Sequence, residues 1–276
     1  METRLTPLCH AAHGLVDRIR QFADEKVLPA MLKLEDDKGR PSRRLDATVY
    51  EAYALMVLWV GSIAKLNETK DVQAIGAGAR SLFEQLLDLK WLEQNPQPEW
   101  SEKFHEFPRV DRYRLAEKVL DYKNNNPDSQ ISEKKFREIM AMLNRGEPVA
   151  AVVARLWGKN PKTGNLNWPR HWTGEADILG RAKKLGSEFA DAYQERYRVL
   201  CWLVHSGSSA FHGRDSESIE NYVAHGYLWA FEFAHQGTKL ACEILGIAGN
   251  IPDFDAEMKQ LWDGRTETVR IAPRST

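Results

Sequence analysis

An arginine and a histidine on one helical face are the residues whose types and spacing point most directly to chemistry. Arg198 lies near the start of a mostly apolar run, and His205 ends it seven residues later, just before a loop of small residues at 206–210. This spacing rotates the two positions by about 20° around a helix and separates them by roughly 10 Å along it. Because histidine titrates near neutrality and arginine is a fixed cation, the pair can act on phosphate esters. A second histidine, His212, follows the loop.

Arg80 and Glu84 form a second charged pair, one helical turn apart in a leucine-rich run. Charges among apolar residues persist only when they are paired or hydrogen-bonded. One interpretation is a structural bridge, either Arg80–Glu84 or Glu84–His205. The other is that Glu84 orients His205 while Arg80 binds an anion. We therefore expect these three residues to meet between two packed helices, and Gly76 and Gly78 just upstream indicate a close approach there.

The segment at about 158–174 is the long irregular stretch of the chain. It and the residues just before it interleave cations with Trp157, Trp168 and Trp172, and the cations are Arg155, Lys159, Lys162 and Arg170. Cations among aromatic rings suit single-stranded nucleic acid, through backbone attraction and base stacking. A loop anchored to the core by its tryptophans is the alternative. We assign substrate binding to Tyr197, His212, Trp172 and Arg170, beside the catalytic candidates His205, Arg198, Glu84 and Arg80.

Composition and absent motifs exclude several functional classes. The net charge is −1, so any basic surface for RNA must be local. The chain has neither the His-Glu-x-x-His pattern nor paired Cys-x-x-Cys, and it lacks phosphate-loop, Gly-x-Ser-x-Gly and dinucleotide-binding motifs. We therefore expect no metal and no cofactor. The three cysteines are far apart and odd in number, which favours a reducing compartment over a disulfide framework.

The elements that position these residues are all predicted to be helical. Apolar residues recur with helical periodicity, and no segment alternates as a strand does. The expected fold is an all-α multi-helix bundle forming a single domain at 1–263, with a disordered tail at 264–276. We expect helices at 6–35 with a kink or division at Pro29, 46–69, 71–94, 99–123 interrupted at Pro108, 132–144, 148–157, 175–185, from Tyr197 onward, and 216–245.

The second of these helices, 46–69, is apolar nearly all round and is expected to be central. Its longest apolar run, Ala52–Ala64, lies between Glu51 and Lys65 and is shorter than the roughly 20 residues that a membrane span needs. The N-terminus lacks the pattern of a signal peptide. We therefore expect a cytoplasmic protein without a membrane partner.

Three motifs in order resemble one bacterial family. They are Arg80-Ser-Leu-Phe-Glu84, Trp172-Thr-Gly174 and Tyr197-x3-Cys201-x3-His205. Together they are similar to the domain of unknown function 5677, whose pattern has an Arg-x3-Glu helix, a Trp-x-Gly lead-in and Tyr-x3-Ser-x3-His. Cys201 stands where that family usually has serine. The resemblance spans roughly 46–211 and implies an all-helical fold.

A further similarity is to the HEPN superfamily, helical proteins that include metal-independent ribonucleases with an Arg-x4–6-His signature. It rests on Arg198, His205 and the helical class. It implies an endoribonuclease of a toxin or phage-defence type that acts on RNA as a homodimer. The alternative is a non-catalytic helical module that binds a protein or nucleic-acid partner, with Arg80, Glu84 and His205 as an internal polar network.

Overall fold

A computed structural model describes residues 6–35, 43–205, 216–247, 251–254 and 256–261, and at 35, 43, 205 and 216–218 it describes only the backbone. The chain divides into two compact units. The first unit is Met1–Glu93 with Leu185–Thr276, and the second unit is Gln94–Lys184. Within the described residues the named elements are all helical, and the exception to helix is one isolated bridge between Lys159 and Leu166. The predicted all-α class is therefore confirmed.

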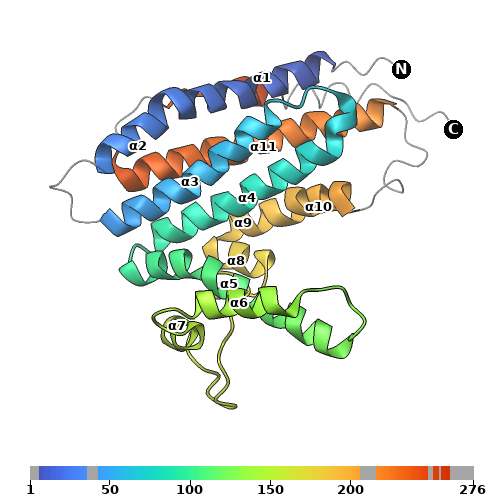
Figure 1. Cartoon of the computed structure of the whole chain (residues 1–276). Coiled ribbons are helices and arrows are strands. Elements are labelled where there is room, and N and C mark those ends of the chain that lie inside the picture. Colours follow the sequence, from blue (N-terminus) through green and yellow to red (C-terminus); the bar gives the residue numbers. More distant parts are fainter. Residues whose placement is uncertain (1–5, 36–42, 206–215, 248–250, 255, 262–276) are drawn as a thin grey trace. The chain divides into compact units, whose positions relative to one another are not determined.

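Long helices that run side by side build the first unit (Figure 1). The last of them, α11, packs against both α1 and α3 and supplies large buried side chains such as Tyr227, Phe231 and Phe233. The elements of this unit are α1 (Pro7–Phe22), η1 (Ala23–Val27), α2 (Leu28–Glu35), α3 (Arg43–Ile63), η2 (Thr69–Asp71), α4 (Val72–Gln94), α9 (Ser187–Ala192), η3 (Tyr193–Tyr197), α10 (Arg198–His205) and α11 (Ser216–Leu245).

The predicted division of the first helix near Pro29 is a π-turn. η1 is π-helical, and the N–H of Leu28 bonds to the carbonyl of Ala23, five residues back. Pro29 has no N–H to donate and its ring would crowd the preceding turn, so a wider turn just before it relieves the conflict. The chain thus continues from α1 into α2 without leaving the helical path.

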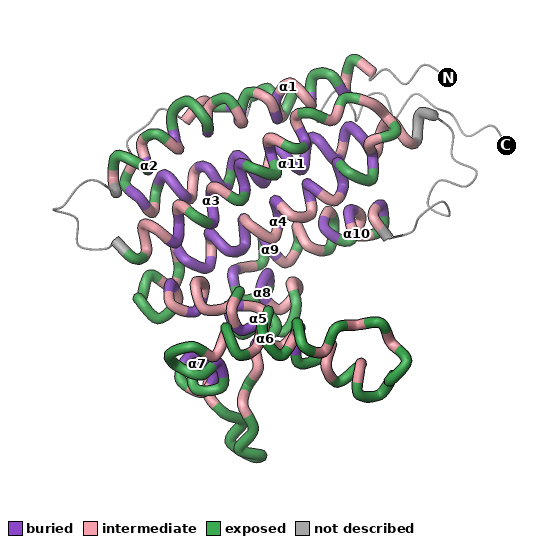
Figure 2. The backbone as a smooth tube through the Cα atoms, viewed as in Figure 1, coloured by how far each residue is buried: buried purple, intermediate pink, exposed green. Residues whose placement is uncertain are grey.

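The expectation that the second helix is central is wrong on one of its faces. α3 buries Val49, Tyr53, Met56 and other residues, but Leu55, Leu58 and Trp59 are 46%, 67% and 38% exposed. These residues follow each other at helical spacing, so they form one face of α3. Figure 2 shows exposed positions beside buried ones along this helix. An apolar helix is fully buried only when neighbours cover all its faces, and α1, α2 and α11 cover only part of α3.

The second unit contains α5 (Pro98–Asn125), α6 (Glu133–Leu143), α7 (Val149–Leu156) and nearly all of α8 (Ile178–Leu185). Its apolar cluster lies between α5 and α7, around Val110 and Val153. The predicted break at Pro108 is wrong, because α5 continues through that residue. Ser132 caps α6, and Asp177 caps α8, since its carboxylate accepts from the N–H of Gly180, so α8 begins at Ile178 and not at the predicted 175. The irregular segment at 158–174 has no helix.

The single-domain prediction for 1–263 stays a prediction, since two compact units can still unfold as one domain. The predicted tail at 264–276 lies outside the described residues. In the parts of the chain that the structure describes, no helix combines the length and the apolar character of a membrane span.

Candidate functional site

Arg80 and Glu84 of α4 meet the hydroxyl of Tyr197 at the end of η3. The Arg80 Nε atom donates to the Tyr197 Oη atom at 2.9 Å and to the Glu84 Oε1 atom at 3.2 Å. Tyr197 in turn donates its hydroxyl proton to Glu84 Oε1 at 2.7 Å. Tyr197 is 3% exposed, whereas the Arg80 and Glu84 side chains are 29% and 32% exposed. The three residues form one polar network between two helical segments, the charge-pairing that their apolar setting demands.

Aromatic rings fix the position of Tyr197 from two sides. Its ring lies 5.4 Å from that of Phe83, centroid to centroid, and 5.1 Å from that of Tyr193, with which it is stacked. The Arg80 guanidinium lies over the same ring at 5.5 Å. Tyr197 was expected to bind substrate, but here its hydroxyl and its ring are both occupied by the protein.

α4 and α10 run antiparallel, and the register follows from the contacts along them. Glu84 meets Tyr197, and eight residues earlier on α4 a Cβ atom at Gly76 would lie 3.6 Å from the Cβ of Leu203. Arg80 lies between these two levels, and so does Cys201 on the opposite helix. The motifs Arg80-x3-Glu84 and Tyr197-x3-Cys201 therefore face each other turn for turn.

Electrostatics agree with this register. Burial raises the pKa of Tyr197, and its hydrogen bond to the Glu84 carboxylate raises it further. Burial also raises the pKa of the Cys201 thiol, while the nearby charge of Arg80 opposes that rise. Burial by itself lowers the pKa of Arg80, but Tyr197, Cys201 and Glu84 together raise it above its ordinary value. Arg80 is therefore a permanent cation, and Tyr197 stays protonated at neutral pH.

A π-turn sits where the network begins. η3 spans Tyr193–Tyr197, and the N–H of Arg198 bonds to the carbonyl of Tyr193. The sequence from α9 through α10 has neither proline nor glycine inside it, so backbone chemistry does not force this turn. π-turns in helices occur often at functional sites because the extra residue changes which side chains share a face. Here it brings Tyr197 to α4 and leaves Arg198 on the outside.

The outer face of α10 carries the predicted arginine. Arg198 is exposed and donates to the side-chain oxygen of Gln194 at 3.0 Å. Leu200 and Leu203 are fully buried, which places the inner face of α10 nearly opposite Arg198. Position 205 falls about 20° from position 198 around the helix, so it shares the outer face. Trp202 lies between them on that face and is 38% exposed. We did not predict this residue as part of the site, although its spacing of four from Arg198 places it on the same helical face.

Two of the predicted site residues, His205 and His212, are described only in part or not at all. His205 is the last residue of α10 and its side chain is not described, while His212 lies outside the described residues. The predicted contact between Glu84 and the His205 ring therefore stays a prediction. Along the helix, His205 is about 12 Å from Tyr197, the residue that Glu84 contacts.

The other two substrate-binding candidates, Trp172 and Arg170, belong to the second unit. Trp172 is 3% exposed, and its ring packs edge-on against Trp100 and Phe104. Its carbonyl accepts from the indole of Trp157 at 3.1 Å. Trp172 therefore anchors the irregular segment to the core of this unit, and a base would stack on it only if it left these contacts. Arg170 is exposed.

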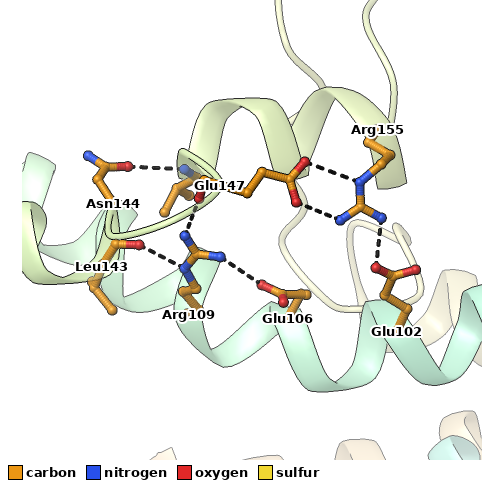
Figure 3. A network of polar contacts seen from close by, with 8 residues as sticks. Glu102, Glu106, Arg109, Leu143, Asn144, Glu147 and Arg155 are labelled. Carbon is orange, nitrogen blue, oxygen red and sulfur yellow. Dashed lines mark hydrogen bonds and ion pairs between the residues drawn. The ribbon is translucent and has the colours of Figure 1, made fainter. Parts of the chain in front are cut away.

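Arg155, one of the cations considered for nucleic acid, is held by carboxylates (Figure 3). Its guanidinium pairs with Glu147 at 2.9 Å and with Glu102 at 2.7 Å. These bonds raise the pKa of Arg155 and lower that of Glu147. Arg109 joins the same region by donating to the carbonyls of Leu143 and Glu147. The network ties α5 to α7 and leaves the charge of Arg155 neutralised by its neighbours.

Among the described residues, no group of three or more histidine, cysteine, aspartate or glutamate side chains is arranged to hold a metal ion. The three cysteines, Cys9, Cys201 and Cys242, are free thiols.

The class that the fold and the site define is an all-helical protein in which an Arg-x3-Glu pair of α4 contacts Tyr197 at the end of η3, directly before α10. The model of the family of unknown function DUF5677 matches residues 55–221, more than half of the chain. The chain therefore belongs to this family, as the motifs indicate. No curated protein and no solved structure matches the chain.

Proposed function

We propose that this protein is a metal-independent endoribonuclease in which His205 moves a proton and Arg198 stabilises charge on the phosphate. The observation that carries the proposal is the partnership of Glu84. Its carboxylate is bonded by Tyr197 and Arg80, so the charges of α4 are satisfied without His205. Of the two structural bridges that the sequence allows, Arg80–Glu84 is present, so Glu84 does not depend on His205 for a partner and His205 is available for another role.

The outer face of α10 supports the same proposal. Arg198 and Trp202 are exposed on that face, and position 205 shares it. A cation beside an exposed indole suits a single-stranded RNA, because the cation attracts the backbone while the indole stacks on a base. The substrate class we propose is therefore unpaired RNA.

The chemistry needs two actions on the RNA. His205, as a general base, takes the proton from a 2′-hydroxyl, whose oxygen then attacks the adjacent phosphorus. The bond from phosphorus to the 5′-oxygen breaks, and that oxygen takes up a proton from water, which leaves a 5′-hydroxyl end and a 2′,3′-cyclic phosphate. Arg198 stabilises the negative charge that develops on the phosphoryl oxygens.

Arg80, Glu84 and Tyr197 have a positioning role in this proposal. Their hydrogen bonds hold the end of η3 against α4, and α10 continues from that point. The face that carries Arg198 is thereby fixed in rotation. The HEPN resemblance adds a homodimer and a toxin or phage-defence context, and these belong to the proposal as well.

The test is an RNA-degradation assay on the purified protein in EDTA, with His205→Ala beside the wild type. Removing a proton-transfer group should slow cleavage by about 10²–10⁴-fold. Arg198→Ala should also slow it, and His10→Ala, which removes an exposed histidine on α1, is the matched control and should cleave normally. Cleaved RNA should carry 5′-hydroxyl ends.

The opposite result supports the binding module. If the wild type never cleaves unpaired RNA and His205→Ala melts several degrees lower, then His205 is a structural residue. A buried polar group left without its partner costs roughly 1–3 kcal/mol, which accounts for such a shift.

A further inference from the structure

The irregular part of the second unit is basic, and the proposed ribonuclease site does not use it. From 148 to 174 the chain has four cations and no acidic residue, whereas its average composition would place about four acidic residues there. One of these cations, Arg155, is neutralised by neighbouring carboxylates. Lys159, Lys162 and Arg170 are exposed and form no ion pair among the described residues. The chain therefore has a local basic surface despite its net charge of −1.

The two lysines lie on a short hairpin, residues 158–168, whose shape is fixed by hydrogen bonds. Lys159 forms the bridge with Leu166, and the N–H of Asn160 bonds to the carbonyl of Asn165 at 2.7 Å. At the tip, the side-chain oxygen of Asn160 accepts from the N–H of Lys162 at 2.9 Å. The hairpin extends beyond α7 as a narrow loop (Figure 1), and its tip is exposed (Figure 2). It therefore presents two ammonium groups to solvent from a defined backbone.

The base of the hairpin is anchored to the helices of the same unit. The ring of Trp168 stacks on that of Tyr113 in α5, with the centroids 6.0 Å apart and the planes within 1°. Arg114, also in α5, donates to the carbonyl of Pro169. Leu166 packs against the apolar cluster between α5 and α7. Because the hairpin is already ordered, a ligand that binds it loses little affinity to ordering the loop.

We propose that this hairpin binds the phosphate backbone of unpaired RNA, with the ammonium groups of Lys159 and Lys162 as its phosphate contacts. The choice of unpaired RNA rests on the proposed function. Lysine attracts phosphate whatever the base sequence, so the hairpin holds RNA without selecting its sequence. We choose RNA over a lipid surface because residues 159–165 are exposed and include no large apolar side chain to enter a bilayer.

The experiment measures the binding of a short fluorescent 2′-O-methyl oligouridylate by fluorescence anisotropy, from about 50 to about 200 mM salt. The 2′-O-methyl groups prevent cleavage, so binding is measured apart from catalysis. K159Q/K162Q should raise Kd about 10–30-fold at about 100 mM salt, since each phosphate contact of a single strand contributes about 0.7 to the slope of log K against log salt. That slope should become shallower by about 1.4 in the double variant and by about 0.7 in each single variant.

K134Q/K135Q is the matched control, because it removes two exposed lysines of α6 in the same unit. It should bind within about twofold of the wild type, and circular dichroism should show that both double variants keep their helices. A wild type that does not bind the oligouridylate, or a K159Q/K162Q variant that binds it as tightly as the control does, would overturn the proposal. So would a wild type that binds phosphatidylserine vesicles in place of the oligouridylate.

Cleavage of unmodified RNA, followed in parallel, separates this proposal from the proposed ribonuclease. If the wild type binds the oligouridylate through the two lysines and never cleaves RNA, the hairpin proposal stands and the ribonuclease proposal fails. If the wild type cleaves RNA but K159Q/K162Q binds like the control, the hairpin proposal alone is wrong.

Discussion

The hydroxyl of Tyr197 serves a cation and a carboxylate at once, accepting from Arg80 and donating to Glu84. A phenol can do both only while it stays protonated, and burial together with Glu84 raises the pKa of Tyr197. The tyrosine therefore links two charged side chains on one helix to the backbone of another. Arg198, the next residue along the chain, is exposed and contacts only its own helix in the described hydrogen bonds.

Because Tyr197 is bonded within the protein and its neighbour Arg198 is exposed, we expect substitutions of the two residues to affect stability differently. Tyr197→Phe keeps the ring but removes the hydroxyl, so the Glu84 carboxylate loses the hydrogen bond that this hydroxyl donates to it. We expect the free energy of unfolding to fall by about 1–2 kcal/mol. Arg198→Ala should change it by less than about 0.5 kcal/mol, because that side chain is exposed. Urea denaturation measures both, and equal losses would contradict the positioning role of Tyr197.

At the scale of elements, two glycines of α4 have different neighbours. A Cβ atom at Gly78 would lie 2.6 Å from the Cγ1 atom of Ile63, which is 1% exposed and has no room to move. A Cβ atom at Gly76 would lie 3.6 Å from Leu203, an ordinary contact. α3 thus approaches α4 more closely at Gly78 than α10 does at Gly76.

We therefore expect Gly78→Ala to destabilise the protein by about 1–3 kcal/mol through overpacking. Gly76→Ala should be neutral or stabilise it by up to about 1 kcal/mol, since alanine favours a helix more than glycine does. Urea denaturation of the two variants side by side is the measurement. If Gly78→Ala were as stable as Gly76→Ala, the close contact with α3 would be wrong.

The sequence predicts most helices because apolar periodicity and capping residues act locally. α11 begins and ends where periodicity places it, and Ser132 caps α6. Pro29 marks the π-turn at η1, but the π-turn at η3 has no such signal, because neither proline nor glycine lies in or beside it. The sequence also predicts the pairing of Arg80 with Glu84, but not the third member of this polar network, Tyr197, which lies over 100 residues away in the chain. Only the register of two packed helices selects that tyrosine.

At the scale of the whole molecule, the stability of the fold depends on pH through His171, a histidine of the second unit. The His171 Nε2 atom accepts from Arg181 at 2.9 Å, and burial together with the Arg181 charge lowers the pKa of His171 to about 2. The unfolded chain takes up a proton at this residue below about pH 6.5, whereas the folded protein does not until about pH 2. His171 therefore makes the folded state less stable as the pH falls through that range.

His171→Gln should remove this sensitivity. Between pH 7.5 and 5.0 we expect the wild type to lose up to about 2 kcal/mol more than the variant, since one proton changes stability by about 1.4 kcal/mol per pH unit. Urea denaturation followed by circular dichroism at the two pH values measures the difference. Parallel losses in both proteins would show that His171 does not stay neutral in the fold.

The first unit is made of two stretches of chain with the whole second unit between them. During synthesis the ribosome releases α1, α3 and α4 early, but α11, which packs on α1 and α3, emerges only after the second unit has been made. At about 5–20 residues per second this interval lasts many seconds. The nascent chain must therefore carry the apolar surfaces of its first helices uncovered for that time, which makes them natural clients for a chaperone at the exit tunnel.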